Sequence, residues 1–145
     1  MNVVSLDMIE AFLLDVDMDF PIPLSNKVVL NEYAVKLYEK ATLCCEIDNG
    51  TIVGMVAGYT ENIINDMAYI ALVGVKKEYR ENGVATKLIK QFIDISQQKK
   101  INRIHVYTDC SNKNAMLMYE KLGFKIFNCD NEPRPNDNHY ILKLF

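Results

Sequence analysis

The stretch EYRENGVATKLI, residues 78–89, is the part of the sequence that decides the fold. A polar, turn-prone piece gives way at Gly83 to apolar residues at helical spacing, so we predict that a helix begins there. The preceding run, MAYIALVGV at residues 67–75, is almost wholly apolar and is typical of a strand buried on both faces. A strand that leads into a helix N-terminus presents unpaired N–H groups and the positive end of the helix dipole. This arrangement predicts a cradle for an anion.

Three residues at this helix mouth suit a diphosphate. Gly83 allows backbone and ligand to approach closely, Ala85 keeps the next turn uncrowded, and Arg80 adds a permanent positive charge. An isolated R-x-x-G-x-A string is common by chance, so a tight turn beside a solvated arginine is the alternative interpretation. The sequence contains neither G-x-x-x-x-G-K-[ST] nor G-x-G-x-x-G, which removes the main support for a P-loop or a Rossmann fold.

Hydrophobic periodicity predicts further elements on either side of this stretch. Asn49-Gly50 lies between two strand-like runs and indicates a hairpin with a type I′ turn. Gly123 is well placed to cap the end of a helix. Residues 15–27 contain two prolines and three aspartates, and residues 130–138 are polar, so both are predicted loops. The predicted helices are 5–14, 30–41, 85–99 and 112–122, and the predicted strands are 42–48, 51–59, 67–75, 103–108, 125–129 and 139–145.

The order of these elements predicts an α/β (α+β) fold. We expect a mixed, mostly antiparallel sheet of six to seven strands with helices on both faces. The sequence has no internal repeat, low-complexity segment or linker, and its 145 residues are the size of one ordinary domain. Residues 1–145 are therefore predicted to form a single domain.

The composition narrows the classes of function. Half of the residues are hydrophobic and 24% are charged, which argues against disorder, and the net charge of −3 argues against a nucleic-acid partner. Four cysteines form no C-x-x-C motif and the only two histidines are far apart, so no metal is expected. The sequence shows no signal peptide and no apolar run long enough for a membrane span. We therefore expect a cytoplasmic protein with free thiols and no membrane contact.

Two spaced motifs closely resemble those of the GNAT superfamily, the acyl-coenzyme A-dependent N-acyltransferases. The family's first motif is a strand, then [QR]-x-x-G-x-[GA], then a helix, and VGVKKEYRENGVATKLI follows it with Arg80, Gly83 and Ala85. The second motif, N-x-x-A-x-x-x-Y-x-K-x-G-F, is matched by NKNAMLMYEKLGF about two dozen residues later. Its residues here are Asn112, Ala115, Tyr119, Lys121, Gly123 and Phe124. The resemblance spans residues 67–124 and implies the GNAT fold and acetyl transfer.

The resemblance also implies acetyl-CoA as the co-substrate and a role for each matching residue. The strand Val73-Gly74-Val75 would pair with the pantetheine arm in a splay between two strands, and Asn112 would cap its helix, contact the pantetheine amide, or do both. A backbone N–H near Val73 would stabilise the oxyanion. Tyr119 would donate a proton to the leaving thiolate, whereas the alternative interpretation makes it a core aromatic. The diphosphate would contact the backbone of Arg80, Glu81, Asn82, Gly83, Val84, Ala85 and Thr86.

The sequence does not identify the general base that would deprotonate the acceptor amine. Many relatives place a carboxylate on the central strand, near Ala71 here, but MAYIALVGV contains no acid. Deprotonation of the amine would then pass through water to a backbone carbonyl, or to Tyr69, Glu61 or Asp66. The two histidines, His105 and His139, are weaker candidates, of which His139 could face the acceptor.

The acceptor is expected to be a primary amine on a small polar molecule such as an amino sugar, amino acid or polyamine. Residues 15–24, DVDMDFPIPL, could form an acidic wall around Phe20 or a solvated loop. Tyr33 and Tyr59 could hydrogen-bond to a polar acceptor, and Tyr69 could also contact it. Two alternatives remain: a non-catalytic acyl-CoA sensor and a protein N-acetyltransferase. Dimers are common in the family, so a homodimer is possible.

Overall fold

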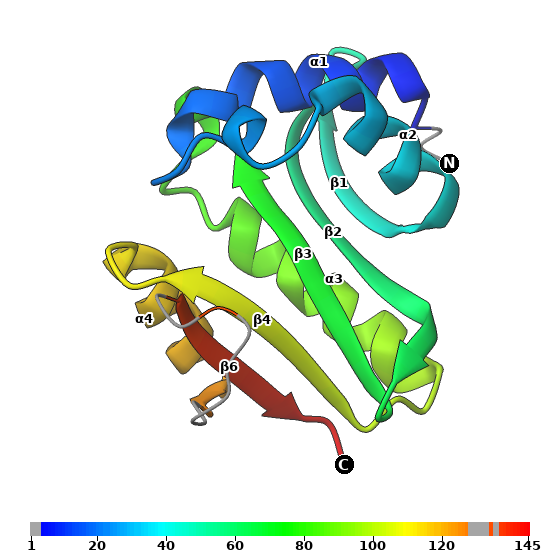
Figure 1. The fold of residues 1–145 in the computed structure, drawn as a ribbon, viewed down its shortest axis with the longest axis vertical. Helices are drawn as coiled ribbons and strands as arrows, with labels where there is room; N and C mark the ends of the chain where they lie inside the picture. Colours follow the sequence, from blue (N-terminus) through cyan, green and yellow to red (C-terminus); the bar gives the residue numbers. More distant parts are fainter. Residues whose placement is uncertain (1–3, 128–133, 135–136) are drawn as a thin grey trace.

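A computed structural model describes residues 4–127, 134 and 137–145. Within this part of the chain, six strands form one mixed sheet with helices on both faces (Figure 1), as predicted. The helices are α1 (Leu6–Val16), α2 (Leu30–Lys40), α3 (Val84–Gln98) and α4 (Lys113–Lys121), with 3₁₀ turns at Asp17–Asp19, Leu24–Asn26 and Lys77–Tyr79. The strands are β1 (Thr42–Asp48), β2 (Thr51–Ile64), β3 (Met67–Val75), β4 (Arg103–Asp109), β5 (Lys125–Ile126) and β6 (Asp137–Lys143).

The strand order is β1-β2-β3-β4-β6-β5. All neighbouring strands are antiparallel except β3 and β4, which are parallel and joined through α3. The β1–β2 hairpin turns at Asn49 and Gly50, whose φ angles of 51° and 72° are the positive values that a type I′ turn needs. Gly123, with φ of 98°, follows the C-terminus of α4 as predicted.

The two faces of the sheet carry separate cores. Alternate residues of a strand point to opposite faces, so β2 contributes Met55 and Ala57 to the core under α1 and α2, and Val56 to the core under α3 and α4. Phe12 and Leu13 anchor α1 to the first core, and both are fully buried. Figure 1 shows α1 and α2 over β1, β2 and the upper end of β3, with α3 behind the sheet.

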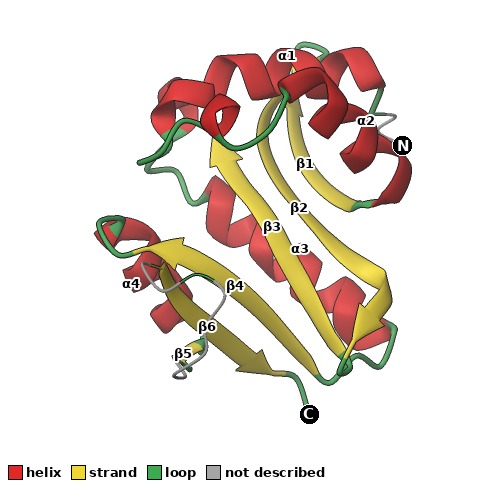
Figure 2. Cartoon of the chain, in the orientation of Figure 1, coloured by secondary structure: helices red, strands yellow, loops and turns green. Residues whose placement is uncertain are grey.

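The sheet divides after the first half of β3. Strands β3 and β4 pair only from Met67 to Ile70, opposite Arg103 to Val106, and then diverge (Figure 2). On the other edge of β3, Ala57 pairs with Leu72 and Gly58 with Ile70, which leaves Ala71 without a partner on β2. One extra residue of this kind is a β-bulge, which bends the strand that carries it. The bulge therefore lies where β3 turns away from β4.

Three of the boundaries that differ from the predictions have a clear physical reason. The predicted loop at 15–27 is partly helical, because α1 extends to Val16 and two 3₁₀ turns follow. Strand β2 continues to Ile64 instead of ending at residue 59, because Ile64 still pairs with Met67. Strand β6 begins at Asp137, two residues early, because it pairs with the end of β4. The predicted strand 125–129 is described only at its start, and residues 128 and 129 lie outside the described residues.

Candidate functional site

The free edge of β3 exposes peptide groups to the gap between β3 and β4. The Lys76 N–H donates to the Val53 oxygen at 2.8 Å, which makes Lys76 a hydrogen-bonded partner of β2. Since such pairs alternate along an antiparallel ladder, Gly74 also faces β2, whereas the N–H and C=O groups of Val73 and Val75 face the gap. One of these carbonyls is already used, because the Arg80 Nε donates to the Val75 oxygen at 2.9 Å.

The loop after β3 turns into α3 through two residues with positive φ, Glu81 at 66° and Gly83 at 76°. The first backbone bond of α3 runs from the Lys87 N–H to the Gly83 oxygen at 3.0 Å, and no side chain caps this end. The N–H groups of Val84, Ala85 and Thr86 therefore have no partner within the helix. A Cβ added at Gly83 would meet nothing within 4 Å, so the mouth of the helix is sterically open, as predicted.

Arg80 does not extend freely into solvent. Its Nη2 forms an ion pair with the Asp19 carboxylate at 2.6 Å, and its Nε is bonded to β3. Lys76 forms a second ion pair with Asp15 at 2.7 Å. Both acids belong to the segment 15–24 that the sequence analysis assigned to the acceptor side. In the structure, these two carboxylates instead neutralise cations beside the mouth of α3.

A first cavity, of about 180 Å³, fills the gap between β3 and β4. We call it the gap cavity. It brings together predicted residues from distant parts of the chain: Phe20, Tyr69, Val73, Asn112 and Tyr119. Phe20 lies over β3, since a Cβ added at Gly74 would be 3.7 Å from the Phe20 Cζ. The Asn112 side chain accepts a hydrogen bond from the Ala115 N–H at 3.2 Å, which confirms the helix cap.

Tyr119 is a core residue that also lines the gap cavity. Its ring is in the core, 3% exposed, with centroids 5.3 Å from Phe124 and 5.9 Å from Tyr140. The residue nevertheless lines the gap cavity. Burial, with a smaller contribution from the charge of Tyr69, raises the pKa of the Tyr119 phenol. The hydroxyl therefore keeps its proton at neutral pH and can act as a donor.

A second cavity, of about 510 Å³, lies on the α1–α2 side of the sheet below these helices. We call it the outer cavity. Its lining includes Tyr59, Tyr69, His105 and Tyr107. The Tyr59 hydroxyl is buried and has no hydrogen-bond partner among the described residues. The outer cavity shares Tyr69, Tyr107 and Arg134 with the gap cavity, so the two cavities meet at these side chains.

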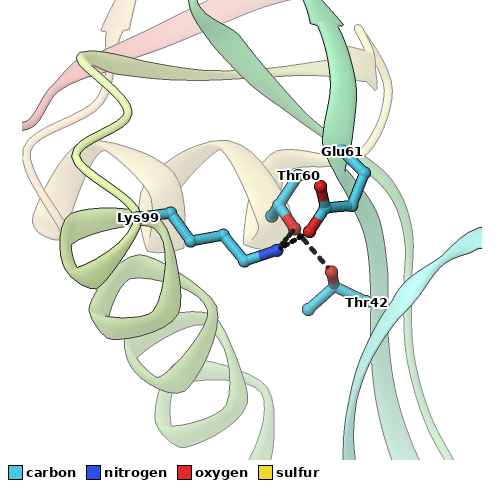
Figure 3. A network of polar contacts seen from close by, with 4 residues as sticks. All are labelled: Thr42, Thr60, Glu61 and Lys99. Carbon is cyan, nitrogen blue, oxygen red and sulfur yellow. Dashed lines mark hydrogen bonds and ion pairs between the residues drawn. The ribbon is translucent and has the colours of Figure 1, made fainter.

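The two carboxylates proposed as bases are already engaged. Figure 3 shows Glu61 at the end of β2, where its carboxylate forms an ion pair with Lys99. Lys99 Nζ also donates to Thr60 Oγ1 at 2.9 Å, and this oxygen is 2.7 Å from Thr42 Oγ1 (Figure 3). The Asp66 carboxylate accepts a hydrogen bond from Asn102 Nδ2. Both acids therefore stabilise the end of the sheet.

The predicted site residues fall into three groups. Phe20, Tyr69, Val73, Asn112 and Tyr119 share the gap cavity, whereas Tyr33 lines neither cavity. The other predicted residues lie outside both linings, at the β3 end and the α3 mouth. Gly74 and Val75 were expected beside the pantetheine arm, and the residues expected at the diphosphate are Arg80, Glu81, Asn82, Gly83, Val84, Ala85 and Thr86.

Tyr107 and Arg134 were not predicted, although both line the two cavities. The alternation in RIHVYT contained a signal for Tyr107, because residue 107 must share a face with His105. Among the described residues, no group of three or more His, Cys, Asp or Glu is placed to hold a metal ion. No helix in the described part of the chain is long and apolar enough to span a membrane.

The fold is similar to solved acetyltransferases over nearly its full length. A GNAT-family acetyltransferase from Staphylococcus aureus Mu50 superposes with a TM-score of 0.78 at 19% identity, covering 100% of this chain and 96% of that chain. The PaiA N-acetyltransferase from Thermoplasma acidophilum, solved in complex with coenzyme A, gives 0.76 at 16% identity, covering 98% and 96%. These likenesses confirm the predicted fold.

Sequence relatives match a shorter segment. N-alpha-acetyltransferase 30 of Schizosaccharomyces pombe is 41% identical over 56 residues, which is 39% of this chain and 37% of that protein. The probable N-acetyltransferase camello of Xenopus tropicalis is 31% identical over 80 residues, 55% of this chain and 36% of that protein. The matched segments thus span little more than a third of these curated relatives.

A family model covers most of the chain. The acetyltransferase (GNAT) family matches residues 13–124, which include both motifs, β3, the mouth of α3 and Tyr119. This match confirms the resemblance and the enzyme class predicted from the sequence. The chain belongs to the acetyltransferase (GNAT) family.

Proposed function

We propose that this enzyme transfers an acetyl group from acetyl-CoA directly to a primary amine of a small polar acceptor, of the amino sugar, amino acid or polyamine class. One observation carries the proposal. Beyond Ile70 the free edge of β3 leaves β4, so that the peptide groups of Val73 face a cavity lined by Tyr119. A thioester in this cavity would have hydrogen-bond donors on two sides.

Donor binding would rest mainly on the backbone. The unpaired N–H groups of Val84, Ala85 and Thr86 would hold the diphosphate, helped by the dipole of α3. The pantetheine arm would lie along the free edge of β3 like an added strand. The coenzyme A complex of the similarly folded PaiA N-acetyltransferase supports this donor.

The chemistry needs a polarised carbonyl and a proton for the leaving group. As the amine nitrogen forms a bond to the acetyl carbon and the carbon–sulfur bond breaks, the Val73 N–H would donate to the oxyanion. Tyr119 would donate a proton to the departing thiolate, and the proton that the amine nitrogen loses on becoming an amide would restore the phenol. Its raised pKa keeps the phenol protonated for this step.

The acceptor would occupy the outer cavity and reach the thioester past Tyr69 and Tyr107. The volume of about 510 Å³ falls within the usual range for small-molecule sites, roughly 300–1,000 Å³, and supports a small acceptor. The Tyr59 hydroxyl, which has no partner among the described residues, would bind a polar group of that acceptor. Cys44 and Cys45 are free thiols, which supports a reducing, cytoplasmic location.

A protein α-amine is the second candidate acceptor, because several sequence relatives are named N-alpha-acetyltransferases. Thiol release from acetyl-CoA, measured across amino sugars, amino acids, polyamines and short peptides with free α-amines, separates the two. We expect turnover with a small polar amine. Turnover with peptides alone would mean that the acceptor is a protein α-amine and not a small molecule. Tight coenzyme A binding without turnover of any amine would indicate a sensor.

A further inference from the structure

Lys27 is the only lysine among the described residues that lines either cavity. It belongs to the segment between α1 and α2 and lines the gap cavity together with Val73 and Tyr119. A lysine side chain ends in a primary amine, which is the chemical group that the proposed function acetylates. The chain therefore carries an acceptor group of its own in the cavity assigned to the thioester.

Hydrogen bonds within the segment hold the backbone that carries Lys27. The N–H groups of Lys27 and Val28 both donate to the Leu24 oxygen, at 2.9 and 3.1 Å. The Ser25 N–H donates to the Asp17 carboxylate at 2.6 Å and so ties this turn to the end of α1. These bonds fix the start of the Lys27 side chain at the wall of the gap cavity.

The Lys27 ammonium acts on the opposite wall of the gap cavity. Asp109, the last residue of β4, also lines this cavity. Its pKa is lowered, mainly by hydrogen bonds from Ser111 and to a smaller extent by the positive charge of Lys27. Unlike Lys76 and Lys99, Lys27 forms no ion pair with any described residue. Its amine is therefore not held by a carboxylate in contact with it.

Other polar side chains of the gap cavity are less suited to take an acetyl group. Arg134 carries a guanidinium, which stays protonated in proteins, and it lies 3.9 Å from the Asp137 carboxylate. Burial raises the pKa of the Tyr69 and Tyr119 phenols, so both stay protonated near neutral pH. A lysine amine becomes a strong nucleophile once it loses one proton, so Lys27 is the best nucleophile in this group.

We propose that Lys27 Nζ is a self-acetylation site, modified by acetyl-CoA bound to the same chain. This inference rests on the proposed function, because it needs the thioester in the gap cavity. The ammonium first gives one proton to water. The neutral nitrogen then forms a bond to the acetyl carbon while the carbon–sulfur bond breaks. Tyr119 protonates the leaving thiolate, and the second proton that the nitrogen loses restores the phenol.

Peptide mapping by mass spectrometry tests the site directly. Wild-type protein incubated with acetyl-CoA and no free amine should gain an acetyl group at Lys27 faster than at Lys40, an exposed lysine at the end of α2 that lines neither cavity. A tethered amine reacts as if it were highly concentrated, which gives Lys27 this advantage. Lys27→Arg keeps the positive charge and should show no acetylation at residue 27. Equal rates at Lys27 and Lys40 would overturn the proposal.

Tyr119→Phe separates an enzymatic reaction from spontaneous acetylation of a reactive lysine. The variant keeps Lys27 but lacks the proposed proton donor, so labelling of Lys27 should slow by roughly ten- to a thousand-fold. Labelling of Lys40 should not change. If Lys27 is labelled equally fast in Tyr119→Phe and wild type, the site does not use the proposed chemistry and the proposal is wrong.

A mixing experiment tests whether the donor and the lysine belong to the same chain. Tagged Gly83→Glu protein, in which donor binding should be weakened, is mixed with wild type at a low acetyl-CoA concentration. Labelling of Lys27 should be confined to the wild-type chains and should not depend on protein concentration. Labelling of the tagged chains that rises with the amount of wild type would show transfer between molecules, which contradicts the proposal.

The same samples distinguish this inference from the proposed function. If small amines are acetylated but Lys27 is not, the inference fails and the proposed function stands. If Lys27 is acetylated but no amine of the panel is, self-acetylation stands and the small acceptor is wrong. If both are acetylated, adding the best amine of the panel should slow labelling of Lys27, because both amines use the same bound donor.

Discussion

The two edges of β3 differ in their hydrogen bonding to neighbouring strands. Its edge toward β2 is paired along most of its length, interrupted by the bulge at Ala71, and joins the two halves of the core. Its edge toward β4 is paired for four residues and then left open. The first edge holds the fold together, whereas the second leaves the peptide groups of Val73 and the N–H of Val75 without a partner on β4. The proposed donor side would thus be built from backbone, and the proposed acceptor side from side chains such as Tyr69 and Tyr107.

The largest effect is expected at the junction of the two sides. Tyr119→Phe removes the proposed proton donor and should lower kcat by roughly ten- to a thousand-fold, while coenzyme A affinity stays the same because donor binding rests on backbone. Steady-state kinetics measure the change in kcat, and calorimetry measures coenzyme A affinity.

Tyr140→Phe is the matched control for this variant. Tyr140 is equally buried and its ring packs on Tyr119, but its hydroxyl donates to Glu120 Oε2 at 2.9 Å and it lines neither cavity. We expect a stability loss of about 1 kcal/mol and nearly normal kcat. If both variants lose kcat equally, packing and not proton donation explains Tyr119.

The backbone character of the donor side is tested at Gly83. Gly83→Glu places a carboxylate in the open mouth of α3 and should weaken coenzyme A binding by about tenfold or more, through like-charge repulsion. Gly50→Glu is the control, because Gly50 has nearly the same φ, 72° against 76°, and equally empty surroundings. Both variants carry similar backbone strain, so equal coenzyme A affinities in titration calorimetry would contradict the cradle.

A smaller effect is expected where the acidic segment touches the donor side. The Asp19 carboxylate holds the Arg80 guanidinium and lies near the proposed diphosphate. Asp19→Asn should therefore tighten coenzyme A binding about two- to fivefold at low salt, in line with the strength of a partly exposed ion pair, and less at high salt.

Asp15→Asn, which breaks the ion pair with Lys76 instead, serves as the control for Asp19→Asn. It should leave coenzyme A affinity closer to the wild-type value. A weaker affinity in Asp19→Asn would mean that Asp19 supports the donor site by positioning Arg80, rather than competing with the diphosphate.

The smallest effect concerns stability at high pH. Burial raises the pKa of Tyr119, so its phenol stabilises the fold fully below the unfolded value of about 10, and this contribution is lost as pH rises above that value. At pH 10 the loss is about 0.4 kcal/mol. Thermal unfolding of wild type should therefore decline slightly faster than that of Tyr119→Phe between pH 9 and 11. Parallel curves would show that the phenol ionises as easily in the folded state.

The local conformation of the proposed donor side was predictable because its residues are close in sequence. Arg80, Gly83 and Ala85 lie within one loop and helix mouth, and helical spacing relates Asn112 to Tyr119. Backbone recognition depends on local conformation, which glycine placement and periodicity indicate directly. The positive φ at Gly83 and the cap at Asn112 are such local features.

The acceptor side was not predictable in the same way. His105 and His139 come together only through the register of β4 with β6, and Tyr107 joins them by alternation along its strand. The sequence does not state strand order or register, so each histidine was a weak candidate by itself. The acids of residues 15–24 were assigned to the acceptor for the same reason, although Asp15 and Asp19 pair with Lys76 and Arg80.

The most direct measurement is a crystal structure with acetyl-CoA bound. The account predicts the diphosphate on the N–H groups of Val84 to Thr86, and the thioester in the gap cavity with its carbonyl at the Val73 N–H and its sulfur near the Tyr119 hydroxyl. A donor bound on another face of the sheet, or a thioester turned away from β3, would contradict it.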